Sequence, residues 1–406
     1  MRIKRTNIIL VLLLITWSSV LYFTLSYRPI YSSEPSQKVN KQIVILEEGI
    51  SEQFNKNNAI INDAQKLLEL KKKGSNRDTN LLPPELQDVK IPVLVFACNR
   101  ITITRCLDNL IRFRPDPDQF PIIVSQDCSH DETKEVIQSY GNQVSLMQQP
   151  DQSDIQVGLK EKKFKGYFKI ARHYGWALNQ IFFNFNFSSV IIVEAWNDNG
   201  KEGLVNADRP DLLYRTDFFP GLGWMLTKSL WLELYTKWPR AYWDDWMRDP
   251  LQRKGRSCIR PEISRTRTFG KVGVSNGMFF ENHLKYIKLN EQFVPFTKMN
   301  LSYLIKENYD RTFVKAVYQS PIINYQDLRE GRVTYEVPVR IMYRNKDDFK
   351  LISKKLGLMD DLKVINTFVS GVPRTAYKGI VTFHYKGKIV HFAPSANWVG
   401  YDVSWS

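Results

Sequence analysis

The chain has 406 residues, of which 43% are hydrophobic and 13% aromatic, and its formal net charge is +15. This length and apolar content allow one large domain with additional segments. Its basic residues are scattered instead of clustering with aromatic residues, which argues against a nucleic-acid-binding protein. The positive charge remains compatible with an anionic substrate such as a nucleotide diphosphate.

The N-terminus has the pattern of a membrane anchor. Arg2, Lys4 and Arg5 precede an apolar run over residues 8–25 that is just long enough to span a bilayer. The heavier positive charge before the run places residues 1–7 in the cytosol and the rest of the chain in the lumen. A cleaved signal peptide is the alternative, but the run is long for one and no clear small-residue cleavage site follows.

Residues 26–90 have the composition of a polar luminal stem. Apolar residues recur there with heptad spacing, at Val39, Ile43, Leu46, Ile50, Ile60, Ala64 and Leu67. A short coiled coil that pairs two stems into a homodimer is one interpretation. A solitary amphipathic helix is the other, because Gln53 and Asn57 interrupt the repeat.

A location in the lumen would permit glycosylation at the Asn186 and Asn300 sequons. The oxidising environment there would also allow disulfides to persist. The four cysteines are Cys98, Cys106, Cys128 and Cys258. No Cys-x-x-Cys occurs and the five histidines are isolated, so the sequence contains no metal-ligand spacing.

Strand and helix patterns alternate from Ile91 onward. The continuous apolar run at Val93–Ala97 predicts a strand buried on both faces. Further strands are expected in "FPIIVSQDCS", "GNQVSLMQQP" and "VIIVE", with helices around Leu107–Phe113 and in "GYFKIARHYGWALNQIFF". This alternation predicts an α/β fold with a mainly parallel sheet. From about Val337 the pattern is strand-rich, with a hairpin that turns at Lys386-Gly387.

Polar residues follow three of the predicted strands, at Asn99-Arg100, Asp127 and Glu194. Ligands of parallel sheets bind beyond the carboxyl ends of the strands, although ordinary polar loops are the alternative. The chain has no G-x-G-x-x-G motif and no P-loop, so neither a dehydrogenase nor a P-loop enzyme is supported.

Aromatic residues surround two acids in "AYWDDWMR", where Trp243 and Trp246 flank Asp244 and Asp245. Buried core positions are the default interpretation of these rings. Rings beside carboxylates also suit a sugar site, since rings stack on C–H faces and carboxylates accept hydrogen bonds from hydroxyl groups.

Long motifs extend from Ile91 to the C-terminus. They include "SQDC", "KIARHY", "WNDNGKE", "LLYRTDFFPGLGWML", "YWDDWMR", "RPEISRTRTFG" and "GVPRTAYKGIVTF". Together they resemble the N-acetylglucosaminyltransferase I family of the Golgi. The resemblance implies a single-pass type II protein of the Golgi membrane, with a GT-A catalytic domain over 91–300 and a smaller strand-rich region over 301–406.

The resemblance also implies a reaction. The expected enzyme moves GlcNAc from UDP-GlcNAc in β-1,2 linkage to the α-1,3 mannose of high-mannose N-glycans on glycoproteins, with inversion and with Mn²⁺ as cofactor. This step starts the formation of complex and hybrid N-glycans. The resemblance assigns donor binding to Arg100, Asp127, His173, Glu194, Trp243 and Ser275. Asp244 corresponds to the catalytic base, which takes the proton of the attacking hydroxyl.

Glu194 marks the largest departure from the family. The family has Glu-Asp-Asp at this strand end, where the last aspartate binds Mn²⁺ and the middle one contacts the donor. Here Ala195 follows directly, and a segment on the order of thirty residues, about one strand–crossover–strand unit, is absent. The metal site is therefore expected to be incomplete, and Asp198 is not expected to replace it, because its family counterpart ends a different strand.

Other departures concern cysteines and an insertion. The resemblance pairs Cys98 with Cys128, matches Cys106 to a free cysteine, and places the family partner of Cys258 in the absent segment. The residues Val364–Val369, "VINTFV", form an insertion. Splicing or a gene-model error would explain both the omission and the insertion.

Three functions follow from these observations. The first is an active transferase, and the second is a weak or inactive variant that keeps the anchor and part of the donor pocket. The third is a β-1,2-GlcNAc transferase acting on O-linked mannose, which the short stem, low in aromatic residues, disfavours. We expect a transferase of the family whose activity in this exact chain is reduced.

Overall fold

The computed structural model describes residues 16–19, 21–22, 53, 89–192, 196–269, 271–274, 277, 279–362, 364–365, 368–369 and 371–405. The chain divides into two compact units, Met1–Thr79 and Asn80–Ser406. Nearly all described residues belong to the second unit. The predicted stem and its coiled coil lie outside the described residues and stay predictions.

The expected single-pass placement in the Golgi membrane is contradicted. Among the residues that the structure describes, no helix is long and apolar enough to cross a membrane. A spanning helix needs about 20 apolar residues. The described helical pieces of the expected anchor cover only 16–19 and 21–22, and the rest of residues 8–25 lies outside the described residues. The single-pass type II assignment is therefore wrong by this criterion.

A five-stranded sheet forms the centre of the N-terminal part of the second unit. Its strand order is β3-β2-β1-β4-β6. The strands are β1 (Val93–Ala97), β2 (Ile122–Gln126), β3 (Val144–Gln148), β4 (Ser189–Ile192) and β6 (Trp224–Thr227). The first four run parallel, and β6 pairs antiparallel with β4. The prediction of a mainly parallel α/β sheet is confirmed, whereas the antiparallel edge strand was not predicted.

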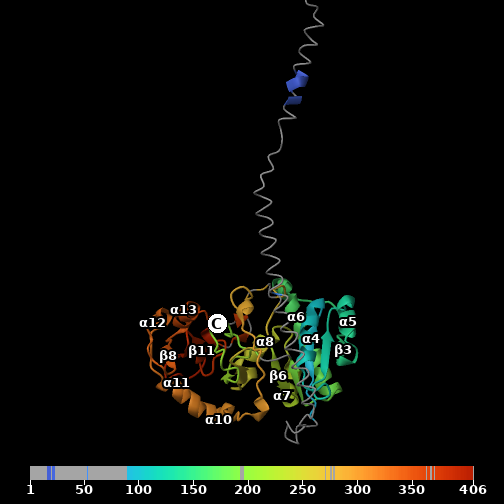
Figure 1. Cartoon of the computed structure of the whole chain (residues 1–406). Coiled ribbons are helices and arrows are strands. Elements are labelled where there is room, and N and C mark those ends of the chain that lie inside the picture. The colour runs from blue at the N-terminus through green and yellow to red at the C-terminus, as the bar shows by residue number, and fades with distance from the viewer. Residues whose placement is uncertain are drawn as a thin grey trace, which may run out of the picture. The chain divides into compact units, whose positions relative to one another are not determined.

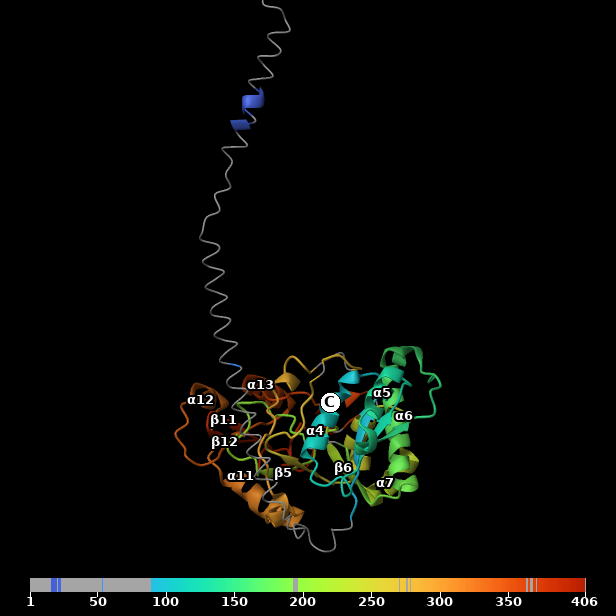
Figure 2. The ribbon, with the colours of Figure 1, turned by 45° about the vertical axis from the view of Figure 1, so that its right-hand side comes forward.

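Helices cover both faces of this sheet (Figures 1 and 2). One face packs against α4 (Thr104–Phe113) and α5 (Asp131–Gln138), and the other packs against α6 (Lys165–Asn179), α7 (Lys228–Leu234) and α8 (Trp243–Arg248). Successive side chains of β1 point to opposite faces of the sheet. Leu94 therefore packs in the hydrophobic core on the α6 side, while Val93 and Val95 pack in the core on the α4 side. A π-helical segment, η5 (Gln180–Asn184), continues α6.

The C-terminal part has its own sheet, ordered β11-β12-β8. The hairpin of β11 (Val381–Tyr385) and β12 (Lys388–Ala393) turns at Lys386-Gly387 as predicted, and β12 pairs in parallel with β8 (Val339–Met342). Helix α13 (Lys346–Leu356) packs on this sheet, with the Phe349 ring stacked 5.2 Å from that of Phe392. Further helices are α10 (Lys306–Tyr309), α11 (Lys315–Gln319) and α12 (Tyr325–Glu330).

Two strand pairs and several short helical turns complete the described elements. The pairs are antiparallel: β5 (Leu213–Thr216) with β7 (Cys258–Pro261), and β9 (Val364–Ile365) with β10 (Phe368–Val369). The two ends of the inserted "VINTFV" segment therefore pair with each other. The remaining elements are α9 (Pro250–Arg253), η2 (Ile101–Ile103), η3 (Gly141–Gln143), η4 (Leu159–Phe164), η6 (Tyr235–Lys237), η7 (Leu284–Tyr286), η8 (Phe296–Lys298), η9 (Ser302–Leu304), η10 (Asp310–Val314) and η11 (Val403–Trp405).

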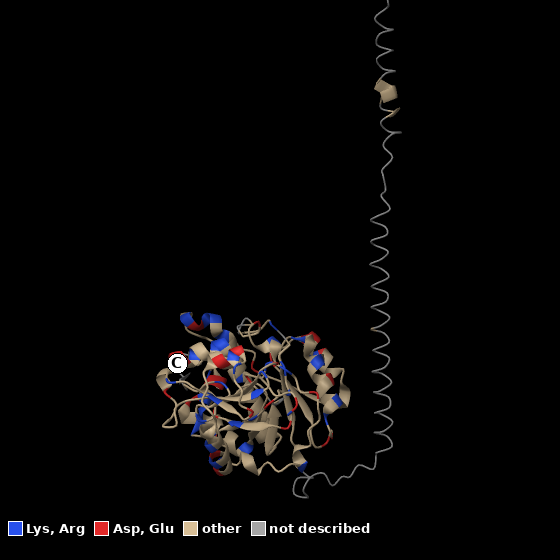
Figure 3. Cartoon of the chain, turned by 60° about the vertical axis from the view of Figure 1, so that its left-hand side comes forward, with Lys and Arg blue, Asp and Glu red and all other residues tan. Residues whose placement is uncertain are grey.

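Charged residues are distributed over many elements of the second unit (Figure 3). Lysine and arginine alternate with aspartate and glutamate along the ribbon instead of following one continuous stripe. Most of the ion pairs, such as Arg332 with Asp327, are solvent-exposed, and such pairs contribute little to stability.

Arg374 is the main buried cation between distant segments. Its guanidinium pairs with Asp198 and donates to both carboxylate oxygens of Asp361, at 2.7 and 2.8 Å. It also lies 5.1 Å over the ring of Phe218 and 5.2 Å over that of Phe279. Burial acts to lower the pKa of Arg374, but the charges of Asp198 and Asp361 outweigh it and raise that pKa. The group is thus a permanently charged link between these segments.

We expect Arg374→Met to lower the free energy of unfolding by about 3–5 kcal/mol, because Asp198 would remain buried without its cation. Urea denaturation of the purified chain measures this. The matched control is Arg332→Met, which breaks an exposed pair and should cost less than about 1 kcal/mol. Equal losses in the two variants would contradict a structural role for the Arg374 pair.

Candidate functional site

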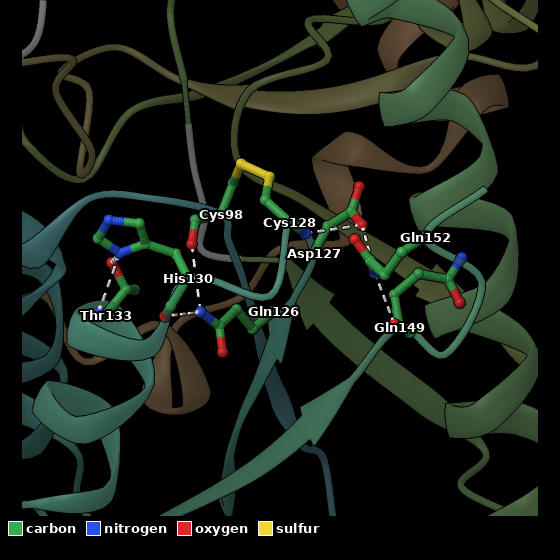
Figure 4. The surroundings of a disulfide bond; sticks show 8 residues. All are labelled: Cys98, Gln126, Asp127, Cys128, His130, Thr133, Gln149 and Gln152. Carbon is green, nitrogen blue, oxygen red and sulfur yellow. Dashed lines mark hydrogen bonds between the residues drawn. A yellow bond between two sulfur atoms is a disulfide. The ribbon is translucent and has the colours of Figure 1, made fainter. Parts of the chain in front are cut away.

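Asp127 is held in a fixed position at the carboxyl end of β2 (Figure 4). Its backbone N–H donates to the carbonyl of Ala97, at the end of β1, over 2.9 Å. Its Oδ1 accepts from the backbone N–H of Cys128 at 2.9 Å and from Gln152 Nε2 at 3.1 Å. The side chain is 7% exposed, so the carboxylate is a buried acceptor with a defined orientation.

A disulfide joins Cys98, after β1, to Cys128, after β2 (Figure 4). The pairing that the resemblance implied is therefore confirmed. Cys128 and Ser129 follow Asp127 with left-handed φ values of 71° and 45°, which non-glycine residues seldom adopt. The disulfide and the hydrogen bonds of Asp127 hold this turn at the carboxyl edge of the sheet.

His173 lies on α6 and is 5% exposed. Its Nε2 is 2.7 Å from Ser125 Oγ, and its ring packs edge-on against Phe96 at 5.0 Å. Burial lowers the pKa of His173 to about 4, the nearby charge of Asp127 acts in the opposite direction, and Arg172 lowers it further. The imidazole is therefore neutral at physiological pH and lies within electrostatic range of Asp127.

A stack of three aromatic rings connects the sheet with α6 and α8. Phe96 of β1 stacks on Tyr174 of α6 at 3.7 Å, and Tyr174 stacks on Trp243 of α8 at 4.4 Å. Trp243 is 6% exposed, and it also contacts Trp224 and Trp238. Since His173 precedes Tyr174, the stack brings the first turn of α8 close to the sheet edge that carries Asp127.

Asp244 is oriented by Arg248 one helical turn later. Arg248 Nη1 is 3.0 Å from Asp244 Oδ2 and 2.5 Å from Asp245 Oδ1. The same guanidinium donates from Nε to the carbonyl of Phe219 at 2.8 Å and from Nη2 to that of Pro220 at 3.4 Å. Arg248 is 4% exposed and Asp244 is 27% exposed, so a buried cation holds a carboxylate that solvent can reach.

Arg100 is exposed and follows β1. Its Nη2 donates to the carbonyl of Val272. A Cβ atom at Gly166, in the first turn of α6, would lie 2.9 Å from the methyl groups of Val274. The segment 271–274 is therefore in contact with both Arg100 and the start of α6, and any larger residue at Gly166 would displace it.

Four of the predicted site residues lie in one region, because the elements that carry them are in contact: Asp127, His173, Trp243 and Asp244. Arg100, at the end of β1, instead contacts the 271–274 segment. Glu194 and Ser275 lie outside the described residues, so their expected positions stay predictions. Sequence reasoning missed Arg248 and Gln152. The spacing of Arg248, four residues after Asp244, was an available signal for an ion pair on one helix face, whereas Gln152 lies in a loop without any pattern.

A manganese centre requires several acidic or histidine side chains close together. Within the described ranges, no group of three or more His, Cys, Asp or Glu residues could hold a metal ion. Asp198, the nearest acid after the Glu194–Ala195 junction, is engaged by Arg374. Glu194 lies outside the described residues, and the described side chains near the junction do not supply the several oxygen ligands that a manganese site needs.

The fold defines the class of the protein. It is an α/β protein with polar residues at the carboxyl edge of a mainly parallel sheet. The model of the GNT-I family matches residues 4–195 and 193–405, nearly the whole chain. The chain is also 39% identical, over 323 residues, to the Arabidopsis thaliana protein named alpha-1,3-mannosyl-glycoprotein 2-beta-N-acetylglucosaminyltransferase, covering 72% of this chain and 70% of that relative. The chain belongs to the GNT-I family. The two matched segments meet at residues 193–195, where Glu194 and Ala195 stand.

Acidification should destabilise the fold through His173. Between pH 6.5 and about 4 the unfolded histidine takes up a proton that the buried one does not, so the stabilisation present above pH 6.5 is lost as pH falls toward 4. The loss is on the order of 1–3 kcal/mol. Urea denaturation at several pH values should show a smaller pH dependence in His173→Gln than in the unsubstituted chain. An unchanged dependence would mean that folding does not lower the pKa of His173.

Proposed function

We propose that this chain descends from, and retains the framework of, an inverting β-1,2-N-acetylglucosaminyltransferase with a GT-A fold. The donor would be UDP-GlcNAc and the acceptor the α-1,3 mannose of high-mannose N-glycans. Family membership and the name of the plant relative support the activity. The observation that carries the proposal is the ring stack that joins the Asp127–His173 edge of the sheet to Trp243 and Asp244.

The Asp127 end of this region suits the nucleotide. A buried carboxylate with fixed orientation is a strong acceptor for the N–H or O–H groups of a uridine. A neutral His173 can donate or accept one further hydrogen bond without a charge that would need desolvation. The guanidinium of Arg100 carries the positive charge that a diphosphate would require.

Asp244 suits the role of proton acceptor. An inverting transfer needs one carboxylate to take the proton of the mannose hydroxyl while its oxygen attacks the anomeric carbon and UDP departs. No covalent enzyme intermediate is needed. The contact with Arg248 fixes the orientation of the carboxylate, and the partial exposure of Asp244 leaves it accessible to a hydroxyl group. Trp243 would flank the donor sugar from the adjacent position.

The Glu194–Ala195 junction favours a weakened enzyme. Where the family has two further aspartates, one for Mn²⁺ and one for the donor, this sequence continues with Ala195. The interruption of the family match at residues 193–195 supports an internal omission at this point. Stabilisation of a leaving group by a metal is worth several kcal/mol, so its loss would slow transfer severely.

A second candidate function is therefore a non-catalytic nucleotide-sugar-binding protein. The same Asp127, His173 and Arg100 arrangement supports it, because binding of uridine does not require the lost aspartates. Turnover and binding, measured on the same preparation, distinguish the two candidates.

The first test of the proposed function uses the purified chain with Mn²⁺, UDP-GlcNAc and a high-mannose acceptor. We expect UDP to bind, but transfer to be at least about 100-fold slower than in the plant relative, which corresponds to the loss of several kcal/mol of transition-state stabilisation. Asp127→Asn should weaken UDP binding by about tenfold through the loss of a charge-assisted hydrogen bond. A transfer rate near that of the relative would overturn the prediction of a weakened enzyme.

The second test concerns Asp244 in a version of the chain with the family's segment restored after Glu194. Asp244→Asn should lower the transfer rate by about 10²–10⁴-fold, since a general base contributes this much, and should leave UDP binding unchanged. The exposed Asp208 supplies the control, and Asp208→Asn should leave both quantities unchanged. If Asp244→Asn turned over like its parent, the assignment of the base would be wrong.

A further inference from the structure

Four aromatic rings gather where the start of α6 meets the residue before α8. Tyr242 is in contact with the other three, at ring-centre distances of 5.1 Å to Tyr167, 6.2 Å to Phe168 and 6.4 Å to Phe164. Phe168 is 7% exposed and forms the buried base, whereas Phe164 is 38% exposed and Tyr167 and Tyr242 are half-buried. We refer to Phe164, Tyr167 and Tyr242 as the aromatic platform.

Carboxylates lie close to this platform. Burial raises the pKa of Tyr167, and the charges of Asp244 and then Asp245 raise it further. Burial is also the largest cause of the raised pKa of Tyr242, followed by the charge of Glu161. Both phenol groups are therefore within electrostatic range of acids, and one of these acids is the candidate base Asp244.

The position of Tyr242 in the chain strengthens this arrangement. Its backbone is left-handed, with φ 54° and ψ 42°, immediately before α8 begins at Trp243. A bulky residue seldom adopts this conformation, and such residues persist at ligand sites where the surroundings enforce them. Here the conformation places a half-exposed ring two residues before Asp244 and against the rings of α6 and η4.

The chemistry of the platform favours a neutral polyhydroxylated ligand. Aromatic faces bind the C–H faces of a sugar ring, and neighbouring carboxylates accept hydrogen bonds from its hydroxyl groups. Asp244, which acts on the charge of Tyr167 and is 27% exposed, can accept a hydrogen bond from a hydroxyl group of a bound sugar. At the exposed edge of the platform, the ammonium of Lys163 lies 4.8 Å from the ring centre of Phe164.

We propose that the aromatic platform is the subsite for the mannose residues of the acceptor glycan, which it holds beside Asp244. Tyr242 and Tyr167 stack on the sugar nearest to Asp244, and Phe164 contacts the next sugar toward solvent. The identity of the sugar rests on the proposed function, whereas the presence of a carbohydrate subsite rests on the rings and acids described above.

The experiment titrates the full chain with a trimannoside that contains α-1,3- and α-1,6-linked mannose, with saturation-transfer NMR as the readout. We expect saturable binding with magnetisation transfer from aromatic protons. Tyr242→Ala and Tyr167→Ala should each weaken binding by about tenfold, whereas Tyr242→Phe should retain it because the ring face is kept. Phe293→Ala, which removes a ring that is 90% exposed in another segment, is the matched control and should leave binding unchanged.

Binding of UDP by the same variants separates local from general damage. If Tyr242→Ala lowered UDP binding as well, Phe164→Ala, at the exposed edge, would decide the question. Undetectable binding of the trimannoside, or equal affinity in the alanine variants and the unsubstituted chain, would overturn the platform proposal. Binding of the trimannoside without binding of UDP would support the platform and count against the proposed donor. Binding of UDP without binding of the trimannoside would support the donor and overturn the platform.

Discussion

The stack of Phe96, Tyr174 and Trp243 is the contact on which the candidate site depends. Each ring comes from a different element, β1, α6 or α8, and the two stacked contacts join these elements directly. Because the stack fixes the distance between the sheet edge and α8, it also fixes where Asp244 lies relative to Asp127. A change in any of the three rings would therefore alter the placement of Asp244 relative to Asp127.

Two buried arginines share the ring of Phe218, with Arg248 at 4.5 Å and Arg374 at 5.1 Å. Arg248 orients Asp244, while Arg374 neutralises Asp198 and Asp361. In a medium of low dielectric constant such cations are tolerated only with close carboxylates and ring faces. The consequence for function is that Asp198 serves the fold, because its charge is already compensated. An acid with that role is unsuited to substitute for the aspartates that would follow Glu194 in the family.

The proposed function rests on family membership and on the polar groups at the carboxyl edge of the sheet. The disulfide and the hydrogen bonds of Asp127 and His173 hold these groups in fixed positions beside the parallel sheet. The proposed omission at the Glu194–Ala195 junction lies where the two segments that match the family meet. A protein of this kind would separate two properties that its relatives combine, namely binding of the sugar nucleotide and acceleration of its transfer.

Local patterns in the sequence were sufficient for β1 to β4, α6 and the hairpin at Lys386-Gly387, since apolar runs and turn residues depend on neighbours in the chain. The resemblance of long motifs was sufficient for the Cys98–Cys128 bridge. The membrane-span prediction is contradicted, because no helix in the described part of the chain is long and apolar enough to cross a membrane. Only the tertiary structure decided the antiparallel pairing of β6, the contact of Gln152 with Asp127, the capture of Asp198 by Arg374, and the meeting of Tyr242 with Tyr167. These contacts join residues far apart in the sequence, and they arise from packing between elements, for which single segments contain no signal.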